Sequence, residues 1–250
     1  HTQRRRQRQM CIRDRKYGIK IEKEYLKKPK IEYVLRSLYS LIKSIKKLKS
    51  ENKDIEIKLK IVDDNSSEEN LKKLKNLLIL SSLDFEIIGH MFNDHKNYIK
   101  EQKSSETFAN LSSLLKSFEI GKTEGKDLVF FVEDDYLHFE SALEEMIATY
   151  ERIASQLNKE IFMCPSDYPY LYMNNEKTSL LLGSKRHWRS INKTLCTFLA
   201  PISFIDKYWD NFKKNCQDRH DPFEKYLNEL YEKELCICLL YTSDAADDVE

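Results

Sequence analysis

Three consecutive carboxylates, Glu133, Asp134 and Asp135, directly follow an apolar run at positions 128–132. Carboxylates this close repel one another, and a dry strand end makes the repulsion stronger. A divalent cation would relieve it, and hard oxygen ligands suit Mg²⁺ or Mn²⁺, which keep open positions for phosphate oxygens. Such a metal could neutralise the charge that develops on a departing diphosphate. The alternative interpretation is a solvated acidic turn that caps a helix beginning near Phe139.

Asp63 and Asp64 form a second acidic strand end, because they follow a run at 55–62 in which apolar and polar residues alternate. A carboxylate in this place can accept hydrogen bonds from a nucleobase N–H or from ribose hydroxyls. The alternative is a helix N-cap. The spacing of Ser66 and Glu69 predicts a capping box at the start of the next helix.

Helices and strands are expected to alternate along most of the chain. The segments expected to be helical are 31–48, 66–80, 107–120, 139–157, 201–214 and 222–235. Strands are expected at 55–62, 85–88, 128–132 and 161–164, with paired strands across 178–198. This alternation predicts an α/β fold with a mostly parallel central sheet and helices on both faces. Ligands of such sheets bind at the carboxyl ends of the strands, so the two acidic segments should meet at one edge.

The two ends of the chain differ from the rest. Residues 5–15 and 238–247, within the end segments 1–15 and 238–250, can be back-translated into opposite strands of one transposon-based sequencing adapter. We interpret both ends as assembly scars and expect them to pack poorly. A natural Arg-rich arm that binds nucleic acid is the alternative for the first end. The remaining residues, 16–237, suit a single catalytic domain that is truncated at both ends.

Composition argues against several classes of function. The formal net charge is +1, and six of the arginines fall within residues 1–15. The rest of the chain therefore has no excess of basic residues that would indicate binding to nucleic acid. No apolar run approaches the length of about 20 residues that a membrane span needs.

His90, His95 and His138 lack the spacing of metal ligands, so we interpret them as structural or surface residues. Widely spaced cysteines without a Cys-x-x-Cys pair indicate free thiols in a reducing cytoplasm: Cys164, Cys196, Cys216 and Cys236.

The two acidic strand ends are more specific together than either is alone. A strand ending in Ile-Val-Asp-Asp-Asn-Ser-Ser at 61–67, followed by one ending in Phe-Phe-Val-Glu-Asp-Asp at 130–135, resembles the family-2 glycosyltransferases of the GT-A fold. The resemblance covers nearly all of the chain between the two scars. It implies a GT-A fold, with Asp63 or Asp64 in contact with the nucleoside of a nucleotide-sugar donor.

The same resemblance makes the segment that begins at Glu133 the DXD-type element, which binds metal and diphosphate. Asp134 and Asp135 match the DXD pair, and Asp135 is the favoured ligand of Mn²⁺ or Mg²⁺. The first strand of the family should precede the helix expected from Ile31, and residues 16–30 do not supply it, so we expect that strand to have been lost. The Gln-x-x-Arg-Trp element of processive synthases is absent from the sequence, which predicts a non-processive enzyme.

In the family, a carboxylate downstream of the DXD element acts as the catalytic base. Asp221, followed by Pro222 at the expected first turn of a helix, resembles that element. Glu224 is the reserve candidate and Asp167 the third. The alternative role of Asp221 is a plain N-cap.

Acceptor contacts are expected from aromatic and basic residues between 166 and 189. Tyr168 and Tyr170 could stack on sugar faces, although loop tyrosines that are only half-buried explain them equally well. Trp188 and Arg189 belong to a basic segment that could meet donor phosphates or an anionic acceptor. A solvated hairpin face is the alternative for that segment.

The resemblance therefore implies metal-dependent, inverting transfer of a sugar from a UDP- or GDP-sugar to a glycan or lipid-linked acceptor, in the synthesis of cell-surface glycans. The alternatives are a nucleotidyltransferase and a non-catalytic domain that binds nucleotide-sugars. Asp221 discriminates between the transferase and the binding domain, because a domain that only binds the nucleotide-sugar needs no catalytic base. The expected location is the cytoplasm, with peripheral association at the inner face of the membrane as a further expectation.

Overall fold

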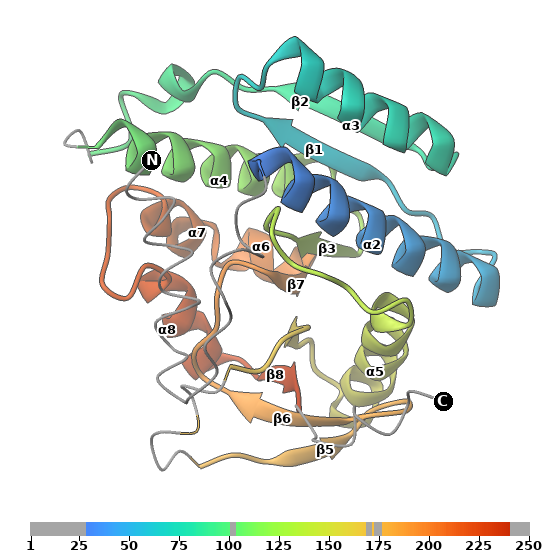
Figure 1. Ribbon diagram of the computed structural model, residues 1–250. Helices are drawn as coiled ribbons and strands as arrows, with labels where there is room; N and C mark the ends of the chain where they lie inside the picture. The colour runs from blue at the N-terminus through green and yellow to red at the C-terminus, as the bar shows by residue number, and fades with distance from the viewer. Residues whose placement is uncertain (1–28, 101–103, 169–171, 173–176, 241–250) are drawn as a thin grey trace. The chain divides into compact units, whose positions relative to one another are not determined.

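The computed structural model describes residues 29–100, 104–168, 172 and 177–240 (Figure 1). These residues form two compact units. The first holds the described residues up to Ile120 together with Glu133–Ser141 and Cys216–His220. The second holds Gly121–Val132, Ala142–Asn215 and the described residues from Asp221 onward. Residues 1–15, which the adapter interpretation assigns to the first scar, lie outside the described part of the chain.

The first unit is built on a two-stranded parallel sheet in which β1 pairs with β2 from Leu59 and Phe85 to Asp63 and Gly89. Its elements are α2 (Lys30–Glu51), β1 (Leu59–Asp63), α3 (Glu68–Ser81), β2 (Phe85–Gly89), the 3-10 helix η2 (Phe92–His95) and most of α4 (Ser105–Glu124). The helices expected at 31–48, 66–80 and 107–120 are confirmed. The strand expected from position 55 begins only at Leu59.

One face of the β1–β2 sheet carries the apolar core of this unit. Alternate residues of a strand point to the same side, and the side chains on the core face are Leu59, Ile61, Phe85 and Ile87. Buried residues of α2 and α3 pack against them: Leu38, Ile42, Leu74 and Leu78. The register also places Lys60 opposite Glu86, and these two side chains form an ion pair. The helices therefore fix which face of the sheet is covered and hence its register.

The turn between β1 and α3 is fixed by two local hydrogen bonds. The backbone N–H of Ser66 donates to Asp63 Oδ2 at 3.1 Å. Ser67 is the N-cap of α3, and its hydroxyl accepts from the backbone N–H of Asn70 at 3.3 Å. The capping box predicted at Ser66 is therefore wrong by one residue, because the Asp63 carboxylate already engages the Ser66 N–H.

The second unit is a six-stranded sheet with helices (Figure 1). The strand order is β3-β7-β4-β8-β6-β5. The β4–β8 pair is parallel, and the other adjacent pairs are antiparallel. Its strands are β3 (Leu128–Phe131), β4 (Phe162–Cys164), β5 (Leu180–Leu182), β6 (His187–Ile191), β7 (Phe198–Pro201) and β8 (Cys236–Leu239). Its helices are α5 (Ala142–Leu157), α6 (Ile202–Lys207), α7 (Trp209–Asn215) and α8 (Lys225–Lys233).

The predicted mostly parallel sheet is therefore wrong, although the α/β class is confirmed. In the described chain, β1 and β2 form a sheet of their own, and the larger sheet is mostly antiparallel. β7 lies antiparallel between β3 and β4, and the hairpin β5–β6 joins the sheet through β8. Hydrophobic periodicity identifies strands but not their partners. The pattern at 178–198 therefore predicted strands paired with each other, and it did not indicate that β7 lies between β3 and β4 or that β8 lies between β4 and β6.

β8 is an interior strand that includes two residues of the second expected scar. Cys238 pairs with Cys164 in β4 and with Arg189 in β6, and its side chain is fully buried. Leu239 pairs with Trp188. The expectation that the second end segment packs poorly is therefore wrong for Cys238, and Leu239 also belongs to the sheet, while residues 241–250 lie outside the described residues.

Candidate functional site

The carboxyl edge of the β1–β2 sheet gathers polar groups in the first unit. Asp63 ends β1 with a buried side chain, and its carbonyl accepts from the backbone N–H of His90 at 2.8 Å. This bond continues the strand pairing one residue past β2. Asp64 follows at the same edge, and its charge acts on the His90 imidazole. The sequence predicted a strand that ends at Val62; the strand runs one residue further, so Asp63 is its last residue and Asp64 follows it.

The acidic triplet follows β3, but its segment Glu133–Ser141 belongs to the first unit. Two contacts hold this segment against α2. Lys30 Nζ lies 2.6 Å from Asp134 Oδ2, and the backbone N–H of His138 donates to Ser40 Oγ at 2.9 Å. Burial lowers the pKa of His138 to about 4, so that imidazole is neutral at pH 7. Both acidic strand ends, the one at Asp64 and the triplet, thus belong to the same compact unit.

A preformed metal cage is not part of this arrangement. Within the part of the chain that the structure describes, no group of three or more His, Cys, Asp or Glu side chains is placed to hold a metal ion. Asp134 already has a cationic partner in Lys30, and both side chains are about half exposed. The hard oxygen donors nevertheless fit Mg²⁺, which is usually held by one or two carboxylates together with substrate phosphates.

The candidate bases Asp221 and Glu224 lie in the second unit. Asp221 is exposed, and α8 begins at Lys225, later than the helix start expected at Pro222. Glu224 is the N-cap residue of α8, and Cys196 Sγ lies 4.0 Å from its Oε1. Burial raises the pKa of Glu224 to about 7. A carboxyl with a pKa near the working pH is well suited to general-base chemistry, and this raised pKa distinguishes Glu224, the reserve candidate, from the exposed Asp221.

The third candidate base, Asp167, is engaged in a buried ion pair. Its Oδ2 accepts from Arg189 Nε at 2.9 Å and its Oδ1 from Arg189 Nη2 at 2.6 Å, while Tyr172 Oη donates to Oδ2. Burial works to raise the pKa of Asp167, but the hydrogen bonds from Arg189 and Tyr172 outweigh it and lower that pKa. A carboxylate held in this way is a poor acceptor for a substrate proton.

The expected acceptor contacts are not brought together at a surface. Trp188 and Arg189 are both buried, so neither side chain is placed to touch an acceptor. Tyr168 is half-buried, and Tyr170 lies outside the described residues. The basic segment has a structural explanation instead, because Arg189 balances Asp167 and Trp188 reaches a buried glutamate, Glu145.

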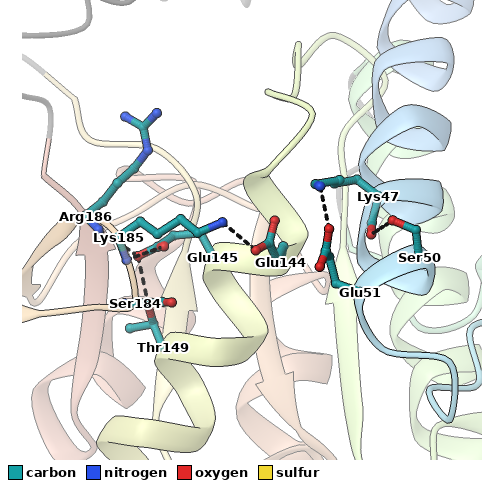
Figure 2. A network of polar contacts seen from close by, with 9 residues as sticks. All are labelled: Lys47, Ser50, Glu51, Glu144, Glu145, Thr149, Ser184, Lys185 and Arg186. Atoms are coloured by element: carbon teal, nitrogen blue, oxygen red, sulfur yellow. Dashed lines mark hydrogen bonds and ion pairs between the residues drawn. The ribbon is translucent and has the colours of Figure 1, made fainter.

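Glu145 of α5 is a polar centre that the sequence did not reveal (Figure 2). Its carboxylate accepts from the backbone N–H groups of Lys185 at 2.8 Å and Arg186 at 3.2 Å, and from Trp188 Nε1 at 3.1 Å. The Thr149 hydroxyl donates to it at 3.1 Å and accepts from the Ser184 backbone N–H at 3.1 Å. The periodic pattern of α5 could have flagged this glutamate, because it stands on the apolar face of the helix between Leu143 and Met146.

No family model matches the chain, and no curated protein matches it in sequence. Among the described residues, no helix combines the length and the apolar character that crossing a membrane requires.

Proposed function

We propose that this protein transfers a single sugar from a nucleoside-diphosphate sugar to a glycan or lipid-linked acceptor, with Mn²⁺ or Mg²⁺ and with inversion. One observation carries the proposal. The acidic triplet after β3 belongs to the same compact unit as Asp63 and Asp64 at the carboxyl edge of β1–β2. Carboxyl edges of parallel strands are where α/β proteins bind nucleotides, and the resemblance of these two segments to family-2 glycosyltransferases of the GT-A fold supports the same assignment.

Each candidate residue has its own expected role. Asp64 would hold the nucleoside by accepting hydrogen bonds from its ribose or base, while Asp63 shapes the turn through the Ser66 N–H. Asp135, with Asp134, would supply carboxylate oxygens to the metal, whose contribution is to neutralise charge on the departing diphosphate. In the second unit, Glu224 is the carboxyl best suited to accept a proton, because burial brings its pKa to about 7.

Calorimetric titration with a panel of UDP- and GDP-sugars tests the proposal. We expect binding of one of these donors in Mn²⁺ that weakens strongly in EDTA, and we expect Asp135→Asn to remove most of that metal dependence. Asp54→Asn, in an exposed turn before β1, is the matched control and should behave as the wild type. Equal donor affinity in Mn²⁺ and EDTA would contradict the metal role.

The reaction products separate the proposal from its nearest enzymatic alternative. A glycosyltransferase given donor and acceptor releases a nucleoside diphosphate, whereas a nucleotidyltransferase releases pyrophosphate from a nucleoside triphosphate. A protein that binds the donor but releases neither product with any acceptor would be a binding domain.

A further inference from the structure

Helices α2 and α3 form one layer of the first unit, because both cover the same face of the β1–β2 sheet. Leu38 and Ile42 of α2 and Leu74 and Leu78 of α3 belong to a single buried cluster on that face, and the two helices contact each other. A helix that buries one side against a sheet leaves the opposite side to solvent. The exposed residues of the two helices therefore lie on the same side of the unit, and we call them the α2–α3 outer surface.

The α2–α3 outer surface is basic, although the chain as a whole is not. The two helices carry nine lysines and arginines against four glutamates, while the whole chain has 42 basic and 41 acidic residues. Two of the four glutamates, Glu51 and Glu69, each pair with a lysine one turn away. The exposed cations that form no ion pair with an acidic residue of the described chain are Arg36, Lys43, Lys46, Lys72 and Lys75. This excess of positive charge attracts an anionic partner.

Large apolar side chains stand among these cations. Tyr39 is 51 % exposed, and Lys43, one turn further along α2, holds its Nζ 5.2 Å from the centre of the Tyr39 ring. On α3, Ile79 lies one turn after Lys75 and is 65 % exposed, and the adjacent Leu80 is 79 % exposed. Helix surfaces that mix lysines with large apolar side chains suit the boundary between lipid headgroups and acyl chains.

The charge and the apolar side chains together identify the partner. A second copy of this chain would present the same excess of positive charge and would be repelled. A nucleic acid would contact the lysines through its phosphates but would leave Ile79 and Leu80 in water. An anionic bilayer satisfies both groups, because its surface attracts each nearby lysine or arginine and its interior takes up apolar side chains.

We propose that the α2–α3 outer surface docks this protein on a bilayer that contains anionic lipids. Its five exposed cations face the lipid phosphates, and Tyr39, Ile79 and Leu80 enter the boundary between headgroups and acyl chains. The docking does not depend on the proposed sugar transfer. The donor site of that proposal lies at the carboxyl edge of β1–β2, whereas the docking surface lies on the helices that cover one face of the sheet.

Sedimentation with lipid vesicles, without any donor present, tests the role of charge. We expect the full chain to bind vesicles of phosphatidylcholine mixed with phosphatidylglycerol, to bind phosphatidylcholine alone weakly, and to lose binding as the salt concentration rises. Each lysine near an anionic surface adds to the attraction, so we expect binding to weaken about tenfold or more in the variant Lys43→Gln/Lys46→Gln/Lys72→Gln/Lys75→Gln.

The control for charge removes four exposed lysines of the second unit: Lys126→Gln/Lys159→Gln/Lys214→Gln/Lys233→Gln. It has the same net charge as the first variant and should bind as the wild type does. Both variants keep the Arg-rich residues 1–15, so any attraction of that segment to the vesicles is common to them. A difference between the two variants therefore reports where the lysines lie.

A second pair of variants tests insertion of the apolar side chains. Ile79→Ser/Leu80→Ser should weaken binding to the mixed vesicles about fivefold or more, because less apolar surface leaves water on docking. Leu180→Ser/Leu182→Ser is the control, since these two leucines of the edge strand β5 are 66 % and 53 % exposed in the second unit. It should bind as the wild type does.

Three results would overturn the docking: no binding to the mixed vesicles, equal weakening in a variant and its control, or unchanged binding in Ile79→Ser/Leu80→Ser. If the vesicles are not bound and a DNA duplex is bound in a way that needs the four lysines of α2 and α3, the surface serves nucleic acid instead. Donor binding by the proposed sugar transferase is measured separately, so failure of one proposal leaves the other standing.

Discussion

Trp188 donates its indole N–H to Glu145 Oε1 at 3.1 Å, and both side chains are buried. Because Glu145 also accepts from two backbone N–H groups of the turn before β6, one carboxylate joins α5 to the β5–β6 hairpin. Gly183 belongs to the same arrangement, since a Cβ there would lie 2.5 Å from both Glu145 Oε1 and Trp188 Nε1. The hairpin is therefore fixed on the helix by hydrogen bonds that the carboxylate alone can accept.

Glu145→Gln should destabilise the protein although the two side chains have nearly the same shape. An amide nitrogen in place of Oε2 would point at the Lys185 N–H, donor against donor, and leave both without partners. An unsatisfied buried polar group costs about 1–3 kcal/mol, so we expect the free energy of unfolding to fall by about 2 kcal/mol or more, measured by urea denaturation. Glu144→Gln, which breaks the side-chain ion pair with Lys185, is the control and should cost less than about 1 kcal/mol. Equal losses in the two variants would refute the role of Glu145.

Glu224 should make stability depend on pH. Its pKa is about 7 in the folded protein against an ordinary value of 4.5, so the folded state holds the proton more tightly than the unfolded state. Stability is then greatest below about pH 4.5, falls as the pH rises through the interval to about 7, and stays low above it, by up to about 3 kcal/mol. Glu224→Gln should remove this slope and be more stable than the wild type at pH 8, as chemical denaturation at pH 5 and pH 8 would show. An unchanged slope would mean that the Glu224 carboxyl is not desolvated.

Glu224 and Asp221 should also differ in their effect on turnover. General-base catalysis typically contributes about a hundred- to ten-thousand-fold. We expect Glu224→Gln to lower kcat by that factor with donor affinity nearly unchanged, and Asp221→Asn to lower it less, because Asp221 is exposed. A product assay with donor and acceptor gives both values. A larger loss of kcat in Asp221→Asn than in Glu224→Gln would identify Asp221 as the base. Loss of donor binding in either variant would indicate a role other than proton transfer.

Lys30 should compete with a metal for the acidic triplet. Its ammonium group lies 2.6 Å from Asp134 Oδ2, and exposed ion pairs of this kind are worth about 0.2–1 kcal/mol. Lys30→Met should therefore tighten Mn²⁺ binding, measured by calorimetry in the presence of UDP or GDP, by about two- to fivefold. Lys47→Met removes an equivalent lysine of α2 that pairs with Glu51, and it should leave the affinity unchanged. Weaker Mn²⁺ binding in Lys30→Met would contradict a metal at Asp134.

The elements of the fold were more predictable than their assembly. Helix α2 follows from apolar residues at helical spacing, and β3 from the run Leu128–Phe131, because both signals are local. The position of β7 between β3 and β4 was not predictable, since nothing local to Phe198–Pro201 specifies a partner many residues away. The parallel arrangement assumed for the whole sheet failed for this reason.

The candidate site shows the same division between local and distant signals. Asp63 and Asp64 were recognisable because a strand end and a following helix are encoded within a few residues. The engagement of Asp167 by Arg189 and the position of Glu145 under the β5–β6 turn depend on contacts between separate elements. Burial decided those roles: it made Trp188 and Arg189 structural, and it raised the pKa of Glu224 to about 7.

The place of β8 in the sheet has a consequence for folding during synthesis. β8 follows every other strand of the larger sheet in sequence, yet it lies between β4 and β6. The hairpin β5–β6 therefore has no strand to join until the ribosome has released the chain beyond Leu239. Until then, β4 and β6 each present an unpaired edge, and such edges are where nascent chains aggregate. Slow translation or premature termination just before Cys236 should therefore yield insoluble rather than partially active protein.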